Sequence, residues 1–231
     1  MSVSLTAILI IAAIELAIEL IIEWLVDLFE WGGETLPPPN INDILAENYK
    51  PEECDVKMKN DCSAMLEEFF DEPKDQPIYV RINEKMKGMS VEEKQKLLKK
   101  ITERASTVMN VHLDSIEFSN VSSMGLYNNQ KNGIVISTAY MELDNCNVEL
   151  VKTIFHELKH AVQFKAISTD GNIWGYSDET LIAWANNFQD YTNYYWDIEG
   201  YYHQPLELDS FGFECSVIPQ PGAEIPQNNV A

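Results

Sequence analysis

The stretch NVELVKTIFHELKHAVQFKAI, residues 147–167, predicts a long helix and contains His-Glu-Leu-Lys-His at positions 156–160. Residues four apart in a helix lie on one face, about a turn from each other. The imidazoles of His156 and His160 can therefore converge on one metal ion, at the distance of about 2.0–2.1 Å that zinc prefers. They are two of the four histidines in the chain, and they predict a metal site on this helix.

Glu157 completes an HExxH motif. It is rotated by about 100° around the helix from His156, so its carboxylate flanks the metal position instead of binding there. A carboxylate in that position can accept a proton from a water molecule that the metal has activated. The motif thus offers two ligands and a general base, and the alternative is a helix with two surface histidines and no metal.

With these residues the sequence resembles the zincin metallopeptidases over residues 76–217. In that family an HExxH helix packs beneath a small sheet, and the edge strand of the sheet binds substrate in an extended conformation. The resemblance implies an α+β, zincin-like fold with a small mixed or antiparallel sheet, further C-terminal helices and one catalytic Zn2+. Residues 134–140 (IVISTAY) are the expected counterpart of the edge strand.

A catalytic zinc site has three protein ligands and one open position, so a third ligand must lie outside the motif. The extended pattern HExxHxxGxxH is absent, because Gln163 and Ala166 stand where its glycine and third histidine would be. The gluzincin subgroup instead takes a glutamate from a later helix. The segment QPLELDSF at 204–211 resembles the P-x-E-x-D-A segment of many small bacterial and phage zincin-like domains, with Ser210 in place of the alanine.

The resemblance implies Glu207 as the third metal ligand, beside His156 and His160. Asp209 and His203 are alternatives, and Asp209 is also a candidate for fixing an imidazole N–H from outside the ligand set. A carboxylate at Glu207 would also be favourable for another reason, because it lies near the N-terminus of a predicted helix.

A hydrogen-bond donor aimed at the developing oxyanion would assist peptide hydrolysis. The candidates are aromatic side chains that come shortly before Glu207, and Tyr202 and His203 are the leading ones. Packing at a partly solvent-exposed surface is the alternative role for these tyrosines. The wider set is Tyr194, Tyr195, Tyr201, Tyr202 and His203.

The remaining pattern indicates helices and short strands in one α+β domain. Ser90 and Glu93 form a capping box, Ser177 is a predicted N-cap, and Pro205 fits the first turn of the last helix. The predicted helices cover 59–71, 90–109, 147–167 and the segments after Ser177 and Pro205. The predicted strands cover 78–83, 115–119, 124–128 and 134–137, and a Tyr/Trp-rich link covers 191–202.

Residues 3–29 predict a separate, amphipathic N-terminal helix with a broad apolar face and a stripe of acids. This helix has three possible roles: association with a partner or with itself, contact with a membrane, or a leader peptide that is removed. Prolines at 37–39 predict a stiff linker after it.

The expected organisation follows from these boundaries. It consists of the N-terminal helix at 1–36, a proline linker and short helix at 37–75, the zincin-like domain at 76–217 and a flexible tail at 218–231.

The chain of 231 residues carries a net charge of −21, from 37 acids against 16 bases. Such a surface repels phosphate backbones, which argues against nucleic-acid binding. Residues 166–231 hold ten acids and no lysine or arginine. The cysteines form no CxxC pair and are too few and scattered to indicate a cysteine zinc site or a disulfide scaffold.

These features predict a zinc-dependent metalloendopeptidase that acts on a polypeptide substrate, with Glu157 as general base. A phage protein or a secreted effector or toxin would fit, in a secreted, virion-associated or membrane-associated location. One alternative is a non-catalytic, zinc-stabilised interaction protein that docks through its N-terminal helix. The other is a membrane-active protein in which residues 3–29 insert.

Overall fold

The computed structural model describes residues 40–168 and 171–221, which belong to one compact unit. The predicted N-terminal helix and most of the predicted tail lie outside the described residues. Within the described residues, no helix combines the length and the apolar character needed to cross a membrane.

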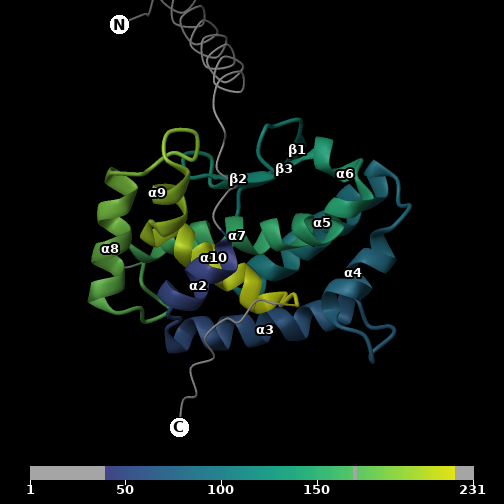
Figure 1. The fold of residues 1–231 in the computed structure, drawn as a ribbon, viewed down its shortest axis with the longest axis horizontal. Coiled ribbons are helices and arrows are strands. Elements are labelled where there is room, and N and C mark those ends of the chain that lie inside the picture. Colours follow the sequence, from purple (N-terminus) through teal and green to yellow (C-terminus); the bar gives the residue numbers. More distant parts are fainter. Residues whose placement is uncertain (1–39, 169–170, 222–231) are drawn as a thin grey trace, which may run out of the picture. The chain divides into compact units, whose positions relative to one another are not determined.

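The described residues form an α+β fold in which a small sheet lies on one side of a group of helices (Figure 1). The helices α7 and α10 lie in the middle of the unit, with the sheet on one side and α3 on the opposite side. The elements before the sheet are α2 (Ile41–Asn48), α3 (Glu53–Phe69), α4 (Ile78–Met86) and α5 (Val91–Val108). The strands are β1 (Ser115–Ser119), β2 (Gly125–Asn128) and β3 (Gly133–Ser137). They are followed by α6 (Thr138–Met141), a 3-10 turn (Asp144–Cys146), α7 (Asn147–Ala166), α8 (Asp178–Gln189), α9 (Ile198–His203) and α10 (Pro205–Val217).

The sheet is mixed and has the strand order β1-β3-β2. The central strand β3 runs parallel to β1, with Ser115 opposite Gly133, and antiparallel to β2, with Gly125 opposite Ile136. The predicted α+β class and small mixed sheet are therefore confirmed.

The prediction that residues 134–140 form an edge strand is wrong. Residues 134–137 belong to β3, which pairs on both sides, and the chain continues from Thr138 into α6. The strand at the edge beside α7 is β2. A Cβ atom added to Gly125 of β2 would lie 2.5 Å from Thr153 Cγ2 of α7, so the strand and the helix approach closely.

The predicted strand at 78–83 is also wrong, because these residues begin α4. The segment is rich in residues that favour strands, but Ile82 and Met86 are four apart and both fully buried on one helical face. Arg81 is buried too, and its guanidinium donates to Glu67 Oε2 at 2.7 Å. Packing against α7, together with the ion pair to Glu67 of α3, thus overrides the local preference.

The core extends beyond the predicted limits of the zincin-like domain. Helix α3 starts at Glu53, earlier than expected, and places Met65 and Leu66 in the same core as α7. Ile218, the first residue of the predicted tail, is fully buried. The segment 191–202, expected to be a link, contains most of α9.

The predicted helix starts are confirmed where a capping side chain marks them. Ser90 Oγ accepts from Glu93 N at the start of α5, and Ser177 Oγ accepts from Thr180 N at the start of α8. Pro205 occupies the first turn of α10. Helix α7 spans almost the whole predicted range, and its central turns are buried on most sides.

Candidate metal centre

Three side chains from two helices converge at the centre of the unit. His156 and His160 come from successive turns of α7, and Glu207 comes from the first turn of α10. His156 Nε2 lies 3.1 Å from both His160 Nε2 and Glu207 Oε2. His160 Nε2 lies 3.2 Å from Glu207 Oε1. The structure therefore brings together the three residues that the sequence suggested as metal ligands.

The spacing of these donor atoms fits a tetrahedral metal ion. Ligand atoms that lie 2.0–2.1 Å from zinc in tetrahedral geometry are about 3.3 Å apart. Two imidazoles and a carboxylate are also a donor set that suits zinc. The residues present therefore fit one zinc ion, and either oxygen of Glu207 is close enough to serve.

The charges around the two imidazoles also favour a cation. Burial lowers the pKa of His156, but contacts with Glu207 and Glu214 outweigh it and raise that pKa well above its ordinary value. Burial would raise the pKa of Glu207, but His160 and His156 hold it well below the usual range. Because carboxylates outnumber imidazoles here, the cluster is a place where positive charge is stabilised.

The second ring nitrogen of each imidazole faces an acceptor. His160 Nδ1 lies 2.9 Å from Gln163 Oε1 and 3.2 Å from Ser210 Oγ. His156 Nδ1 is buried without a hydrogen bond, and Glu214 Oε2 lies 3.3 Å from it as an ion-pair contact. Histidines that bind metals usually have such acceptors behind them, which fix the ring orientation.

Glu214 is a residue that the sequence reasoning missed. It follows Glu207 by two helical turns, so the two carboxylates lie on one face of α10. This spacing is the signal that could have identified it.

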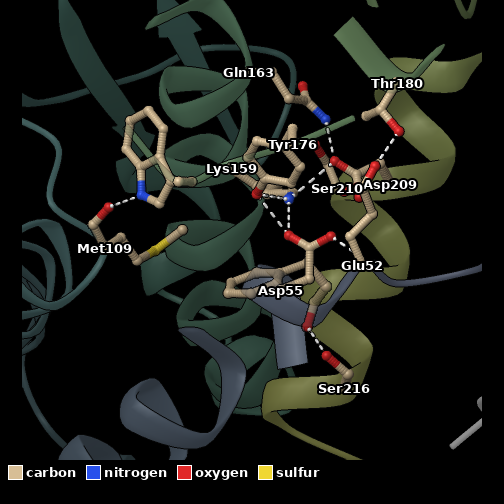
Figure 2. Close-up of polar contacts among 12 residues, drawn as sticks. Glu52, Asp55, Met109, Lys159, Gln163, Tyr176, Thr180, Asp209, Ser210 and Ser216 are labelled. Atoms are coloured by element: carbon tan, nitrogen blue, oxygen red, sulfur yellow. Dashed lines mark hydrogen bonds and ion pairs between the residues drawn. The ribbon is translucent and has the colours of Figure 1, made fainter. Parts of the chain in front are cut away.

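Asp209 is neither a potential metal ligand nor the acceptor of an imidazole N–H, the two roles considered for it from the sequence. Its Oδ2 accepts from Gln163 Nε2 at 2.7 Å and lies 3.2 Å from Lys159 Nζ (Figure 2). It is outside the group of potential ligands and touches neither imidazole directly. Its connection to His160 runs through the amide of Gln163.

Lys159, inside the HExxH motif, is fully buried on the side of α7 that faces α3 and α10. Its ammonium group donates to Asp55 Oδ1 and to Tyr176 OH, the latter at 2.8 Å (Figure 2). Tyr176 OH in turn donates to Asp55 Oδ1 at 2.6 Å. The ammonium also lies 5.3 Å from the centre of the Trp184 ring. This buried network joins α3, α7 and α10 behind the potential metal ligands.

Glu157 lies beside the three converging residues, between α7 and the edge strand β2. It is buried, and burial raises its pKa, while His156 and His160 act in the opposite direction. Its Cγ is 3.4 Å from the position that a Cβ of Gly125 would take. The glycine thus allows the strand to approach the carboxylate.

Two tyrosines interact with Glu207: Tyr201, which belongs to the predicted aromatic set, and Tyr191, which the sequence reasoning did not include. The Tyr191 hydroxyl donates to Glu207 Oε1 at 2.6 Å. Burial, followed by the nearby charge of Glu207, raises the pKa of Tyr201. Tyr191 lies sixteen positions before Glu207, within the predicted link. No local sequence pattern distinguishes it from the other tyrosines of that segment.

The two leading candidates for the oxyanion donor, Tyr202 and His203, make no hydrogen bond to the potential metal ligands. Tyr202 packs on Phe211, with ring centres 5.2 Å apart. His203 is exposed, and its Nδ1 lies 2.8 Å from the carbonyl oxygen of Glu199, to which it donates. His203 is therefore turned to its own helix, and it is not part of the group of potential metal ligands.

Comparisons of the chain with protein-family models, with curated proteins and with solved structures find no match. Functional conclusions therefore rest on the geometry and chemistry of the site.

Proposed function

We propose that this chain is a zincin-like, zinc-dependent metalloendopeptidase. His156, His160 and Glu207 would hold the zinc, and Glu157 would act as the general base. The observation that carries the proposal is the convergence of three donor atoms, 3.1–3.2 Å apart, beside a buried carboxylate from the same helix turn. When bound, zinc would supply Lewis-acid chemistry that polarises a peptide carbonyl and acidifies water.

In this proposal Glu157 moves the proton. Its carboxylate accepts a proton from the attacking water and delivers it to the nitrogen of the leaving amine. Burial favours the protonated form of Glu157, which makes it a stronger base than an exposed glutamate once it is ionised. Its position on α7 holds it next to the ligands without being one of them.

The edge strand β2 is the part of the sheet suited to align a substrate. Its residues 125–128 pair with β3 on one side only within the described residues, and it lies against the turn of α7 that carries Glu157. An extended peptide can add to such an edge through main-chain hydrogen bonds. This role replaces the one expected for residues 134–140.

Metal analysis combined with a cleavage assay tests the proposal. The purified chain should hold one zinc ion, and His156→Ala or His160→Ala should remove it. Glu157→Gln should keep the zinc and lose nearly all cleavage of an unfolded protein such as reduced casein. Full activity of Glu157→Gln would refute the assignment of the base.

A zinc-stabilised interaction protein is a second candidate, favoured by the burial of the cluster. The side chains of His156, His160 and Glu207 are only 8%, 14% and 1% exposed. Zinc that stabilises the fold without any turnover on a broad peptide library would support this alternative. Turnover that disappears in Glu157→Gln would exclude it.

A further inference from the structure

The segment before α10 carries a set of aromatic side chains, four of them exposed and two half-buried, called here the aromatic rim. It consists of Tyr191, Tyr194, Tyr195, Trp196, Tyr201 and Tyr202. The most exposed members are Trp196, at 83%, and Tyr195, at 62%. Large aromatic side chains contribute much of the binding energy where they meet a partner, so several exposed together on one short segment point to a binding surface.

Ring contacts connect the five tyrosines of the aromatic rim to one another, and Trp196 follows Tyr195 directly in the chain. The set reaches the proposed zinc ligands at two points. Tyr191 reaches Glu207 through its hydroxyl. The ring of Tyr202 packs against Phe211, and the ring of Phe211 packs edge-on against His156, with centres 4.5 Å apart. A group held on this surface is therefore close to the proposed reaction centre.

The segment that carries the aromatic rim contains acids and no lysine or arginine. Asp190, Asp197 and Glu199 are exposed within or next to it. No lysine or arginine occurs anywhere in residues 166–231. One oxygen of Asp197 accepts from Gly200 N at 2.8 Å and caps α9, but no such structural role is recorded for the side chains of Asp190 and Glu199.

Elsewhere in the described residues, the chain places its own lysines over aromatic rings. Lys159 lies 4.8 Å from the centre of the Tyr176 ring, and Lys165 lies 5.6 Å from that of Trp174. None of the recorded cation–π contacts involves the aromatic rim. Electron-rich ring faces beside carboxylates attract cations, and no lysine or arginine of the described residues lies over these rings.

We infer that the aromatic rim receives lysine or arginine side chains of a polypeptide substrate, next to the bond that is cleaved. This inference rests on the proposed peptidase function and names its substrate class. A purely apolar side chain would gain from the rings but would remove water from the neighbouring carboxylates without pairing with them, which is costly. A basic side chain pairs with the carboxylates, and its aliphatic part packs on the rings.

The test compares two unfolded peptides that differ only in having arginine or its neutral isostere citrulline at the same positions. Binding is measured by fluorescence anisotropy on the zinc-loaded full chain with Glu157→Gln, and cleavage is measured on the unmodified chain. The arginine peptide should bind and react about five- to tenfold better.

Variants locate the effect, because a chain with net charge −21 attracts basic peptides to any surface. Trp196→Ala, and Asp190→Asn combined with Glu199→Gln, should each reduce the preference for arginine to about twofold or less. The control combines Asp75→Asn, in the turn before α4, with Glu84→Gln on α4, which removes the same charge from exposed positions. It should leave the preference unchanged.

The outcomes separate this inference from the proposed function. Cleavage of both peptides at equal rates would support the proposed peptidase function and would refute the preference for basic side chains. A rim-dependent preference in binding, with no cleavage of either peptide, would support the aromatic rim as a receptor for basic side chains and refute the peptidase. A preference lost equally in the control would overturn the inference by assigning the effect to net charge.

Discussion

His156 Nε2 and Glu207 Oε2 lie 3.1 Å apart, although 51 positions separate the two residues in the sequence. This contact joins α7 to α10 and completes the group of potential metal ligands. Its geometry leads to predictions about metal affinity, stability and the approach of the sheet.

Replacing Glu207 should remove most of the affinity for zinc. Glu207→Gln keeps the shape of the side chain but loses the charge that faces both imidazoles, so affinity should fall by more than about 100-fold. Competition with a chromophoric chelator measures this change. Glu84→Gln, at an exposed position on α4, is the matched control. Unchanged affinity in Glu207→Gln would show that Glu207 is not a ligand.

Glu214 should strengthen the binding of zinc without touching it. Its carboxylate faces His156 Nδ1 at 3.3 Å and stabilises the ring orientation and the donor strength of Nε2. Glu214→Gln should therefore lower zinc affinity by about 10- to 100-fold while the ion still binds. The same chelator competition, at constant pH, distinguishes this partial loss from the larger one expected for Glu207. An effect below twofold would show that the contact is incidental.

Lys159 should contribute mainly to stability. Lys159→Met would leave the carboxylates of Asp55 and Asp209 buried without their cation, at a cost of about 3–5 kcal/mol in the free energy of unfolding. Urea unfolding followed by circular dichroism measures the loss. Adding Asp55→Asn and Asp209→Asn should recover part of it, because the uncompensated charges are then removed. A Lys159→Met variant as stable as the parent would contradict this account of the network.

Gly125 should be required for the close approach of β2 to α7. An alanine there would place its Cβ 2.5 Å from Thr153 Cγ2, so Gly125→Ala should destabilise the fold by about 1–3 kcal/mol and displace the strand from Glu157. Thr153→Ser removes that methyl group and keeps the hydroxyl that donates to the Glu149 carbonyl at 2.8 Å. The double variant should therefore recover most of the lost stability in thermal unfolding, and failure to recover would rule out this clash as the cause.

Local sequence signals predicted the parts of the structure that depend on near neighbours. The spacing of His156 and His160 fixed their common face, and Ser90 and Ser177 marked helix starts correctly. The grouping of Glu207 with these histidines followed from a resemblance in a short segment, and the structure places them together.

The signals failed where distant contacts decide the outcome. Residues 78–83 have strand-like composition, yet burial of Ile82 against the core makes them helical. The sequence of β3 does not show whether this strand is central or at the edge of the sheet. That depends on β1 and β2 pairing with its two opposite sides. Tyr191 is one of several tyrosines in its segment, and only the docking of α10 singles it out.

The separation between the two histidines and Glu207 has a consequence for biosynthesis. While a ribosome is still adding the residues after α7, the emerging polypeptide carries both imidazoles but not the carboxylate that completes their ligand set. The nascent chain therefore cannot assemble the proposed zinc site, and the peptidase proposed here would become active only after α10 has been translated and has docked.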